Sequence, residues 1–219
     1  MFEYFITKEE LNMLKRDIKF LTAIRLMRMD NIITTLQSLF YRVLVLDKED
    51  TVSNKRDRLE LILYYGAVLY ESLKTFYDTK DLLKSLEEYK INVEDINYLF
   101  QEWENPASFT KSVLAKIRDK LAFHFDEDVF PEAILKFDSN DDKIQILEAD
   151  SEKSIDVNYS FILVLYYNYL LSYASKGNSD EEKLKYIYDE MNSISVKLRK
   201  VIEKITGELL INIVHEKKI

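Results

Sequence analysis

Glycine and proline are scarce in this chain, and their scarcity constrains the fold more than any other feature. The 219 residues include three glycines and two prolines, far below the usual frequencies of about 7% and 5%. A β-rich fold needs many tight turns, and tight turns depend on these two residue types. The sequence therefore predicts long helices joined by few connections.

Apolar residues recur at helical spacing along the chain. Residues 58–77 are apolar almost all round, which is typical of a helix buried on several sides. Gly66 in this segment indicates close contact with another helix, because glycine otherwise weakens a helix interior. Near Asp30 the apolar stripe of an earlier helix shifts, which predicts a kink or a break. A heptad pattern near the C-terminus indicates packing within an antiparallel bundle; its members are Leu184, Ile187, Met191, Ile194, Leu198, Val201 and Ile205.

Residues 126–156 are the least regular part of the sequence. They contain Pro131 and the polar run 138–142, which favour loops over a continuous helix, and we predict an irregular insertion here. The whole chain, residues 1–219, is predicted to form a single all-α domain built as an antiparallel multi-helix bundle. A chain of this length has enough interior for a sizeable core.

The composition excludes several kinds of site. The chain has no cysteine, two histidines and three scattered glycines, so it has no thiolate metal site and no glycine-rich phosphate loop. Neither histidine follows a glutamate by three residues, as a di-metal carboxylate bundle requires. We therefore expect no metal and no cofactor.

Composition also bears on location and partners. The lack of cysteine suits a reducing cytosol, and the first 15 residues show no secretory pattern. The longest apolar run, residues 161–174, is shorter than the roughly 20 residues that cross a bilayer. We expect a cytoplasmic protein with no membrane partner. The net charge of −8 disfavours general binding to nucleic acid, but it allows a local basic site.

The most specific chemical signal is the run Arg118-Asp119-Lys120-Leu121-Ala122-Phe123-His124-Phe125. On an α-helix, Arg118 falls at one edge of an apolar stripe and His124 falls within the stripe, about 120° away, while Asp119 points elsewhere. Ionisable groups that face inward cost free energy unless they are paired or used. The stripe consists of Val113, Leu114, Ile117, Leu121 and Phe125.

This run resembles the motif of the HEPN superfamily (higher eukaryote and prokaryote nucleotide-binding), an Arg-x(4–6)-His pattern in a helical protein. Five residues separate Arg118 from His124, and Asp119 stands where the family prefers asparagine or another polar residue. The resemblance covers about eight residues and, more loosely, the helical architecture. It implies a metal-independent endoribonuclease, often a toxin or defence effector, whose site forms across a homodimer. A cognate antitoxin would then be a further partner.

The implied chemistry suits these residue types. Carried over by position, Arg118 holds the phosphate and His124 transfers protons, because arginine forks onto phosphate oxygens and histidine titrates near neutrality. In the family a polar or acidic residue on an earlier helix often supports this pair. Here Glu71 is the candidate, with Asp119 as a second supporting residue.

Other interpretations of the same residues stay open. Arg118 can simply pair with a nearby carboxylate, His124 can be a hydrogen-bonded core histidine, and Glu71 can be an ordinary solvent-facing side chain. Arg25 and Arg28 extend an apolar stripe; they either line the same cleft or reach outward to water. At the level of function, the alternatives are a catalytically silent HEPN-like module that binds a nucleotide, RNA or a protein, and an unrelated helical interaction protein.

Overall fold

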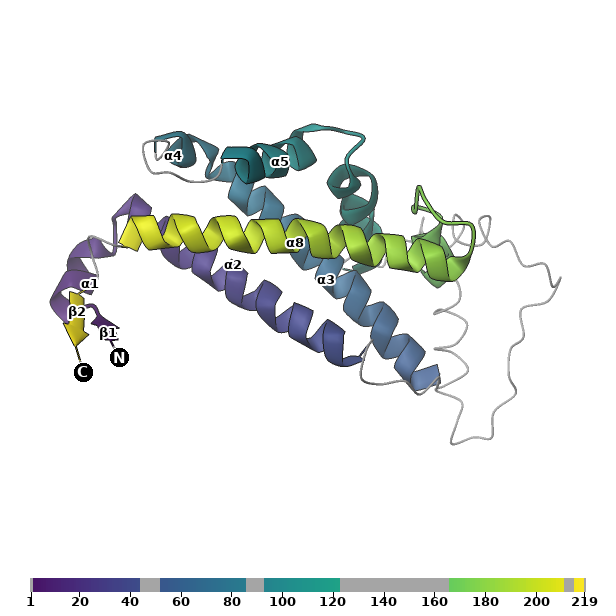
Figure 1. Ribbon diagram of the computed structural model, residues 1–219, viewed down its shortest axis with the longest axis horizontal. Helices are drawn as coiled ribbons and strands as arrows, with labels where there is room; N and C mark the ends of the chain where they lie inside the picture. Colours follow the sequence, from purple (N-terminus) through teal and green to yellow (C-terminus); the bar gives the residue numbers. More distant parts are fainter. Residues whose placement is uncertain (1, 44–51, 86–92, 123–165, 211–214, 219) are drawn as a thin grey trace.

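The computed structural model describes five ranges of the chain, which are residues 2–43, 52–85, 93–122, 166–210 and 215–218 (Figure 1). The predicted insertion at 126–156 and His124 lie outside the described residues. The elements in chain order are β1 (Phe2–Phe5), α1 (Lys8–Leu14), α2 (Ile18–Tyr41), α3 (Val52–Asp78), α4 (Lys80–Ser85), α5 (Val93–Glu104), η2 (Thr110–Leu114), η3 (Ile117–Ala122), α8 (Asp180–Leu210) and β2 (His215–Lys218).

The architecture is an all-α helical bundle, as the sequence predicts. Three long helices form its centre, and α2 runs antiparallel to both α3 and α8 (Figure 1). α5 packs against α3 and α8, while η2 and η3 pack against α3. Among the described residues, the strands β1 and β2 make one antiparallel pair, with Phe2 opposite Lys218 and Phe5 opposite His215. This pairing brings the two ends of the chain together beside α1.

Side-chain caps fix where α1 and α2 begin. Thr7 and Glu10 form a capping box, in which the Thr7 N–H donates to the Glu10 carboxylate at 2.8 Å. Asp17 accepts the Phe20 N–H at 2.8 Å and so starts α2. Such caps satisfy N–H groups that have no partner inside the helix, and they explain why the chain turns between the two helices.

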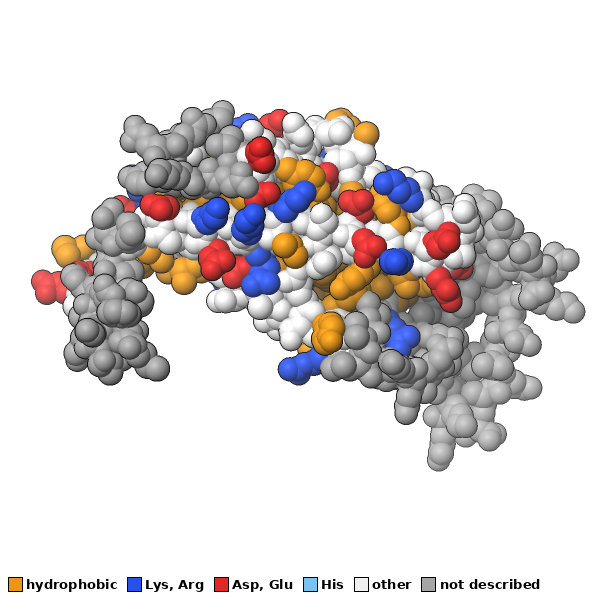
Figure 2. Space-filling model, in the orientation of Figure 1, with side chains coloured by type: hydrophobic (Ala, Val, Ile, Leu, Met, Phe, Trp, Pro, Cys, Tyr) orange, Lys and Arg blue, Asp and Glu red, His pale blue; other side chains and the backbone are white. Residues whose placement is uncertain are grey.

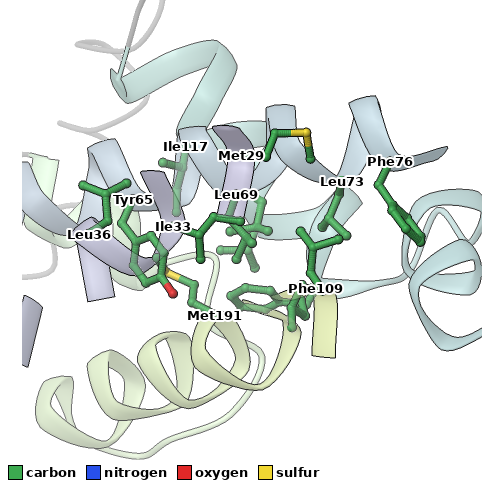
Figure 3. Close-up of a cluster of buried hydrophobic side chains, with 14 of the residues drawn as sticks. Met29, Ile33, Leu36, Tyr65, Leu69, Leu73, Phe76, Phe109, Ile117 and Met191 are labelled. Atoms are coloured by element: carbon green, nitrogen blue, oxygen red, sulfur yellow. The ribbon is translucent and has the colours of Figure 1, made fainter. Parts of the chain in front are cut away.

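One hydrophobic core joins α2, α3, α5, η2, η3 and α8. The heptad pattern of α8 faces this core as predicted: six of its seven members are buried, and Leu184 packs against the cluster. Fully burying one large apolar side chain contributes about 1.5–3 kcal/mol, so this face of α8 is a major source of stability. Figure 3 shows part of the cluster and labels Met29, Ile33, Leu36, Tyr65, Leu69, Leu73, Phe76, Phe109, Ile117 and Met191.

A polar network crosses the contact between α2, α3 and α8. The buried Ser195 Oγ accepts hydrogen bonds from Tyr65 Oη and from Gln37 Nε2, each at 2.7 Å. Arg199 donates from Nη1 to the Gln37 side chain and from Nε to Asp30, each at 2.9 Å. Of the predicted kink or break near Asp30, the break is wrong, because α2 is one continuous helix across this position. Burial raises the pKa of Tyr65 to about 12, so its hydroxyl is a neutral donor at pH 7.

Gly66 lies at a close contact between α3 and η3, as its place in the sequence predicts. A Cβ built at Gly66 would lie 3.0 Å from Cδ1 and 3.1 Å from Cγ2 of Ile117. These separations are tighter than ordinary van der Waals contact. The buried Ile117 side chain therefore fills the space that a side chain at position 66 would need, and this contact sets the register of η3 on α3.

Alanine substitutions at two helical glycines test this contact. A Cβ at Gly207 meets no atom within 4 Å, so Gly207→Ala should stabilise the protein by up to about 1 kcal/mol through helix propensity. Gly66→Ala has the same gain in propensity but crowds Ile117, and overpacking costs about 1–3 kcal/mol. We expect Gly66→Ala to be no more stable than wild type in urea unfolding.

Deleting the crowded methyl provides the control. Ile117→Val removes Cδ1, so it should cost less stability in the Gly66→Ala background than in wild type. A Gly66→Ala variant that gains as much stability as Gly207→Ala would show that α3 and η3 do not approach this closely.

Candidate functional site

A polar junction after α5 positions the segment that carries the predicted motif. Ser108 Oγ donates to the Glu102 carbonyl at 2.6 Å. The Glu102 carboxylate accepts the Thr110 hydroxyl at 3.0 Å and the Thr110 N–H at 3.3 Å. Both Ser108 and Thr110 are buried. These hydrogen bonds thus hold the start of η2 against the last turn of α5.

The motif segment is π-helical over much of its length, whereas the sequence predicts an α-helix. The Ala115 N–H donates to the Thr110 carbonyl five residues earlier, and Ile117–Ala122 is a second π-helical stretch. The predicted apolar stripe is still buried at Val113, Leu114, Ile117 and Leu121. A π-helical turn holds more residues than an α-helical turn, so the 100° projection does not apply here. Short π-helical stretches are rare and occur frequently at functional sites.

Arg118 lies between two carboxylates from different elements. Its Nε donates to Glu71 of α3 at 2.7 Å, and its Nη1 donates to the neighbouring Asp119 at 2.7 Å. The Arg118 side chain is 34% exposed, that of Glu71 42% and that of Asp119 50%. The three charges therefore form a cluster at the surface. Ile117, the residue before Arg118, is buried against α3.

The two hydrogen bonds, to Asp119 first and then to Glu71, raise the pKa of Arg118 above its ordinary value. The guanidinium is therefore always charged, and the two bonds hold its plane. Arginine has five N–H donors, and the bonds to described residues use two of them. The remaining donors are available to an anion that reaches this partly exposed group.

The structure settles where three of the four predicted site residues lie. Glu71 and Asp119 both accept hydrogen bonds from Arg118, so Glu71 belongs to a surface ion pair, and the role of the three residues as a functional site stays a prediction. Asp119, which the sequence places off the apolar stripe but near Arg118, accepts a hydrogen bond from Nη1. The simple ion-pair interpretation of Arg118 is therefore correct as a description of its contacts. The position of His124 relative to Arg118 stays a prediction.

Tyr70 is a neighbour of this cluster that the sequence analysis did not identify. Burial and then the Asp119 charge raise the pKa of the Tyr70 hydroxyl, which places this ring within the electrostatic field of the Arg118 cluster. Nothing in the sequence distinguishes Tyr70 from the many other tyrosines of the chain. The proximity of Tyr70 to the cluster depends on the packing of α5 and η2 on α3.

Arg25 and Arg28 lie beside the face of α3 that carries Glu71. Arg25 Nη2 donates to Thr75 Oγ1 at 3.4 Å, one turn beyond Glu71 along α3. Arg28 borders a groove of about 620 Å³ between α2 and α3. The other residues of this groove are mostly apolar: Ile24, Met27, Asn31, Ile32, Thr35, Leu36, Leu39 and Tyr64. The positive groups of α2 thus lie on the same side of α3 as the arginine cluster.

The charges elsewhere on the described surface are mixed in sign. Figure 2 shows Lys and Arg side chains interspersed with Asp and Glu over the face that carries α8. Among the described residues, no group of three or more metal-ligating side chains could hold a metal ion. Within the same residues, no helix is long and apolar enough to cross a membrane. The Arg118 cluster, in which a guanidinium binds two carboxylates at the surface, is the candidate functional site.

Comparisons with protein-family models, with curated proteins and with solved structures each found no match to this chain.

A double-mutant cycle between Glu71→Ala and Arg118→Ala measures how firmly the cluster holds the guanidinium. Exposed ion pairs contribute about 0.2–1 kcal/mol, and we expect a coupling in the upper part of that range because both charges share a direct hydrogen bond. The coupling should fall in about 1 M salt, where the Debye length is about 3 Å.

Asp119→Ala serves as the control, because its carboxylate binds a different nitrogen of the same guanidinium. The coupling between Glu71 and Arg118 should survive in this background. A coupling near zero in wild type would mean that the two residues are not paired in solution.

Proposed function

We propose that this chain is an HEPN-like protein that cleaves RNA as a metal-independent endoribonuclease and acts as a homodimer. Arg118 is the phosphate-binding cation, and His124 is the general acid or base. Glu71 and Asp119 position Arg118. In a toxin or defence role, a cognate antitoxin would be a further partner.

The observation that carries this proposal is the hydrogen bond from Arg118 to Glu71. The resemblance implies a polar or acidic residue on an earlier helix that supports the arginine, and the Arg118 and Glu71 side chains meet at 2.7 Å across 47 residues of sequence. A surface arginine that is held in place loses less side-chain entropy when it binds an anion than a freely rotating one. The cluster is therefore suited to binding a phosphate group with a defined orientation.

The proposed reaction follows from the two residue types. One histidine takes the proton from the 2′-OH, which attacks the neighbouring phosphorus, and the histidine of the second protomer protonates the departing 5′-oxygen. Arg118 stabilises the negative charge that gathers on the phosphate oxygens in the transition state. No metal is needed, because proton transfer and charge stabilisation are both supplied by side chains.

A catalytically silent RNA- or nucleotide-binding module is the second candidate, and one observation favours it. Arg118 already pairs with two carboxylates, so the cluster has a formal charge of −1, from two negative groups and one positive group. A phosphate must compete with these carboxylates for the guanidinium. That competition weakens binding of the transition state as well as binding of the substrate.

Cleavage of a fluorescently labelled single-stranded RNA in EDTA tests the proposed activity. We expect wild type to cleave and His124→Ala to lose at least about a hundredfold in rate, the usual range for removing a general acid or base. Arg118→Ala should lose a comparable factor through loss of charge stabilisation. The matched controls are His215→Ala on β2 and Arg16→Ala, an exposed arginine between α1 and α2.

Three outcomes separate the candidates. Equal loss in His215→Ala would contradict the site assignment, as would full activity in both site variants. An inactive wild type that binds the same RNA through Arg118 would replace the nuclease with the silent binding module.

A further inference from the structure

A row of aromatic rings extends from the Arg118 cluster across α3 and α5. Tyr70, which precedes Glu71 in the chain, lies 5.1 Å from Trp103 between ring centroids. Trp103 lies 6.1 Å from Tyr77, and Tyr77 lies 5.7 Å from Phe100. All four side chains are partly exposed. The row therefore offers ring surface to a ligand as well as to the protein core.

Lysines lie directly on this row. The Lys111 ammonium is 3.3 Å from the centre of the Trp103 ring and 5.8 Å from that of Tyr70. Lys80 lies 4.4 Å from the centre of Tyr77 and donates to its hydroxyl at 2.8 Å. An aromatic face attracts a cation through its quadrupole. In this state, Lys111 covers a ring face that a planar ligand would otherwise occupy.

Burial opposes the attraction that the Trp103 ring exerts on the Lys111 ammonium. Burial and then the nearby Lys74 charge lower the pKa of its ammonium. Lys74 is exposed on α3, one turn beyond Tyr70. The charges of Lys74 and Lys111 repel each other, and an anion near both reduces that repulsion. Lys74 and Lys111 thus favour a negatively charged group beside the Trp103 ring.

We propose that Trp103, Lys111 and Lys74 form a subsite for one nucleotide of a single-stranded RNA, next to the phosphate held by Arg118. The base stacks on Trp103 after displacing the Lys111 ammonium, and the two lysines bind the adjoining backbone phosphate. Stacking on an aromatic side chain combined with cationic contacts to the backbone is the usual way that proteins hold single strands. Base identity matters little to such a contact, since every base has a π-face.

This subsite rests on the proposed function, because it assigns the surface that guides the same RNA to Arg118. Tyr70 connects the two sites: its ring touches Trp103 at one side, and its hydroxyl lies in the field of the Arg118 cluster. The row and the cluster are formed by the packing of η2, η3 and α5 against α3. Tyr70 is followed in α3 by Glu71, which binds Arg118, so the row ends beside the cluster.

A matched cation–aromatic pair elsewhere in the protein serves as the control. Lys197 of α8 lies 3.4 Å from the centre of the Tyr98 ring of α5. It has nearly the same geometry as Lys111 over Trp103, but it joins α5 to α8 instead of lying beside the Arg118 cluster. If such pairs only stabilise helix packing, substitution of either lysine should have the same effect on RNA binding.

The single tryptophan of the chain makes the subsite directly observable. The probe is an eight-residue oligouridylate whose 2′-hydroxyls are all methylated, so that it cannot be cleaved by 2′-OH attack. We expect it to quench the Trp103 fluorescence of the wild-type protein over the same concentration range in which fluorescence anisotropy of the labelled oligomer reports binding.

Variants separate a binding role from a structural one. Trp103→Ala should weaken binding about 5- to 150-fold, the effect of losing one stacked base, and Trp103→Phe, which preserves packing, should weaken it less. Lys111→Ala and Lys74→Ala should each lower the slope of log affinity against log salt concentration, by up to about 0.7, because together the two lysines neutralise one phosphate of a single strand. Lys197→Ala should leave the affinity and the slope unchanged.

The outcomes that overturn the subsite differ from those that overturn the nuclease. Binding without quenching, an unchanged salt slope in both lysine variants, failure of the oligomer to bind, or an affinity no higher than that of uridine monophosphate each contradicts the subsite. RNA cleavage that persists alongside any of these results leaves the proposed function intact. Conversely, binding that depends on Trp103 in a protein without ribonuclease activity supports the subsite and refutes the nuclease.

Discussion

The contact between Gly66 and Ile117 is the constraint on which the candidate site depends. Because position 66 has no side chain, the branched Ile117 side chain lies directly against the α3 backbone. That contact fixes the height of η3 along α3 and brings Arg118, the next residue, opposite Glu71. The polar site is thus a consequence of apolar packing one residue away, and the ion pair itself needs to supply little stability.

α3 has a different role on each of its sides. Toward α2 and α8 it contributes the buried Tyr65 to a network in which every hydroxyl and amide has a partner, so that side specifies helix register. Toward η3 and α5 it presents Glu71 and Tyr70, which are only partly buried. Fully satisfied buried groups make a rigid framework, whereas partly exposed charges and rings can exchange partners. The framework and the candidate binding surface therefore share one helix.

Sequence reasoning could predict what depends on local pattern. The scarcity of turn residues predicted the fold class, and the heptads predicted the buried face of α8. Gly66 predicted a close contact between helices. It identified Glu71 as a support for Arg118 only through a family resemblance, because 47 residues separate them. The break at Asp30 was wrong because a shift of the apolar stripe does not by itself interrupt the hydrogen bonds of a helix, and α2 is continuous there. The π-helical turns and the row from Tyr70 to Trp103 depend on tertiary packing. No periodicity in the sequence indicates them.

Nuclear magnetic resonance of the arginine Nε–H groups tests the central claim most directly, namely that Glu71 holds Arg118 in a fixed orientation. Because Arg118 Nε donates to Glu71 at 2.7 Å, its proton should exchange slowly with water and give a resolved signal, assigned by its loss in Arg118→Lys. The signal should broaden and shift toward those of exposed arginines in Glu71→Ala, and it should persist in Asp119→Ala, since Asp119 binds Nη1. An Arg118 Nε–H that exchanges as fast in wild type as in Glu71→Ala would contradict the account.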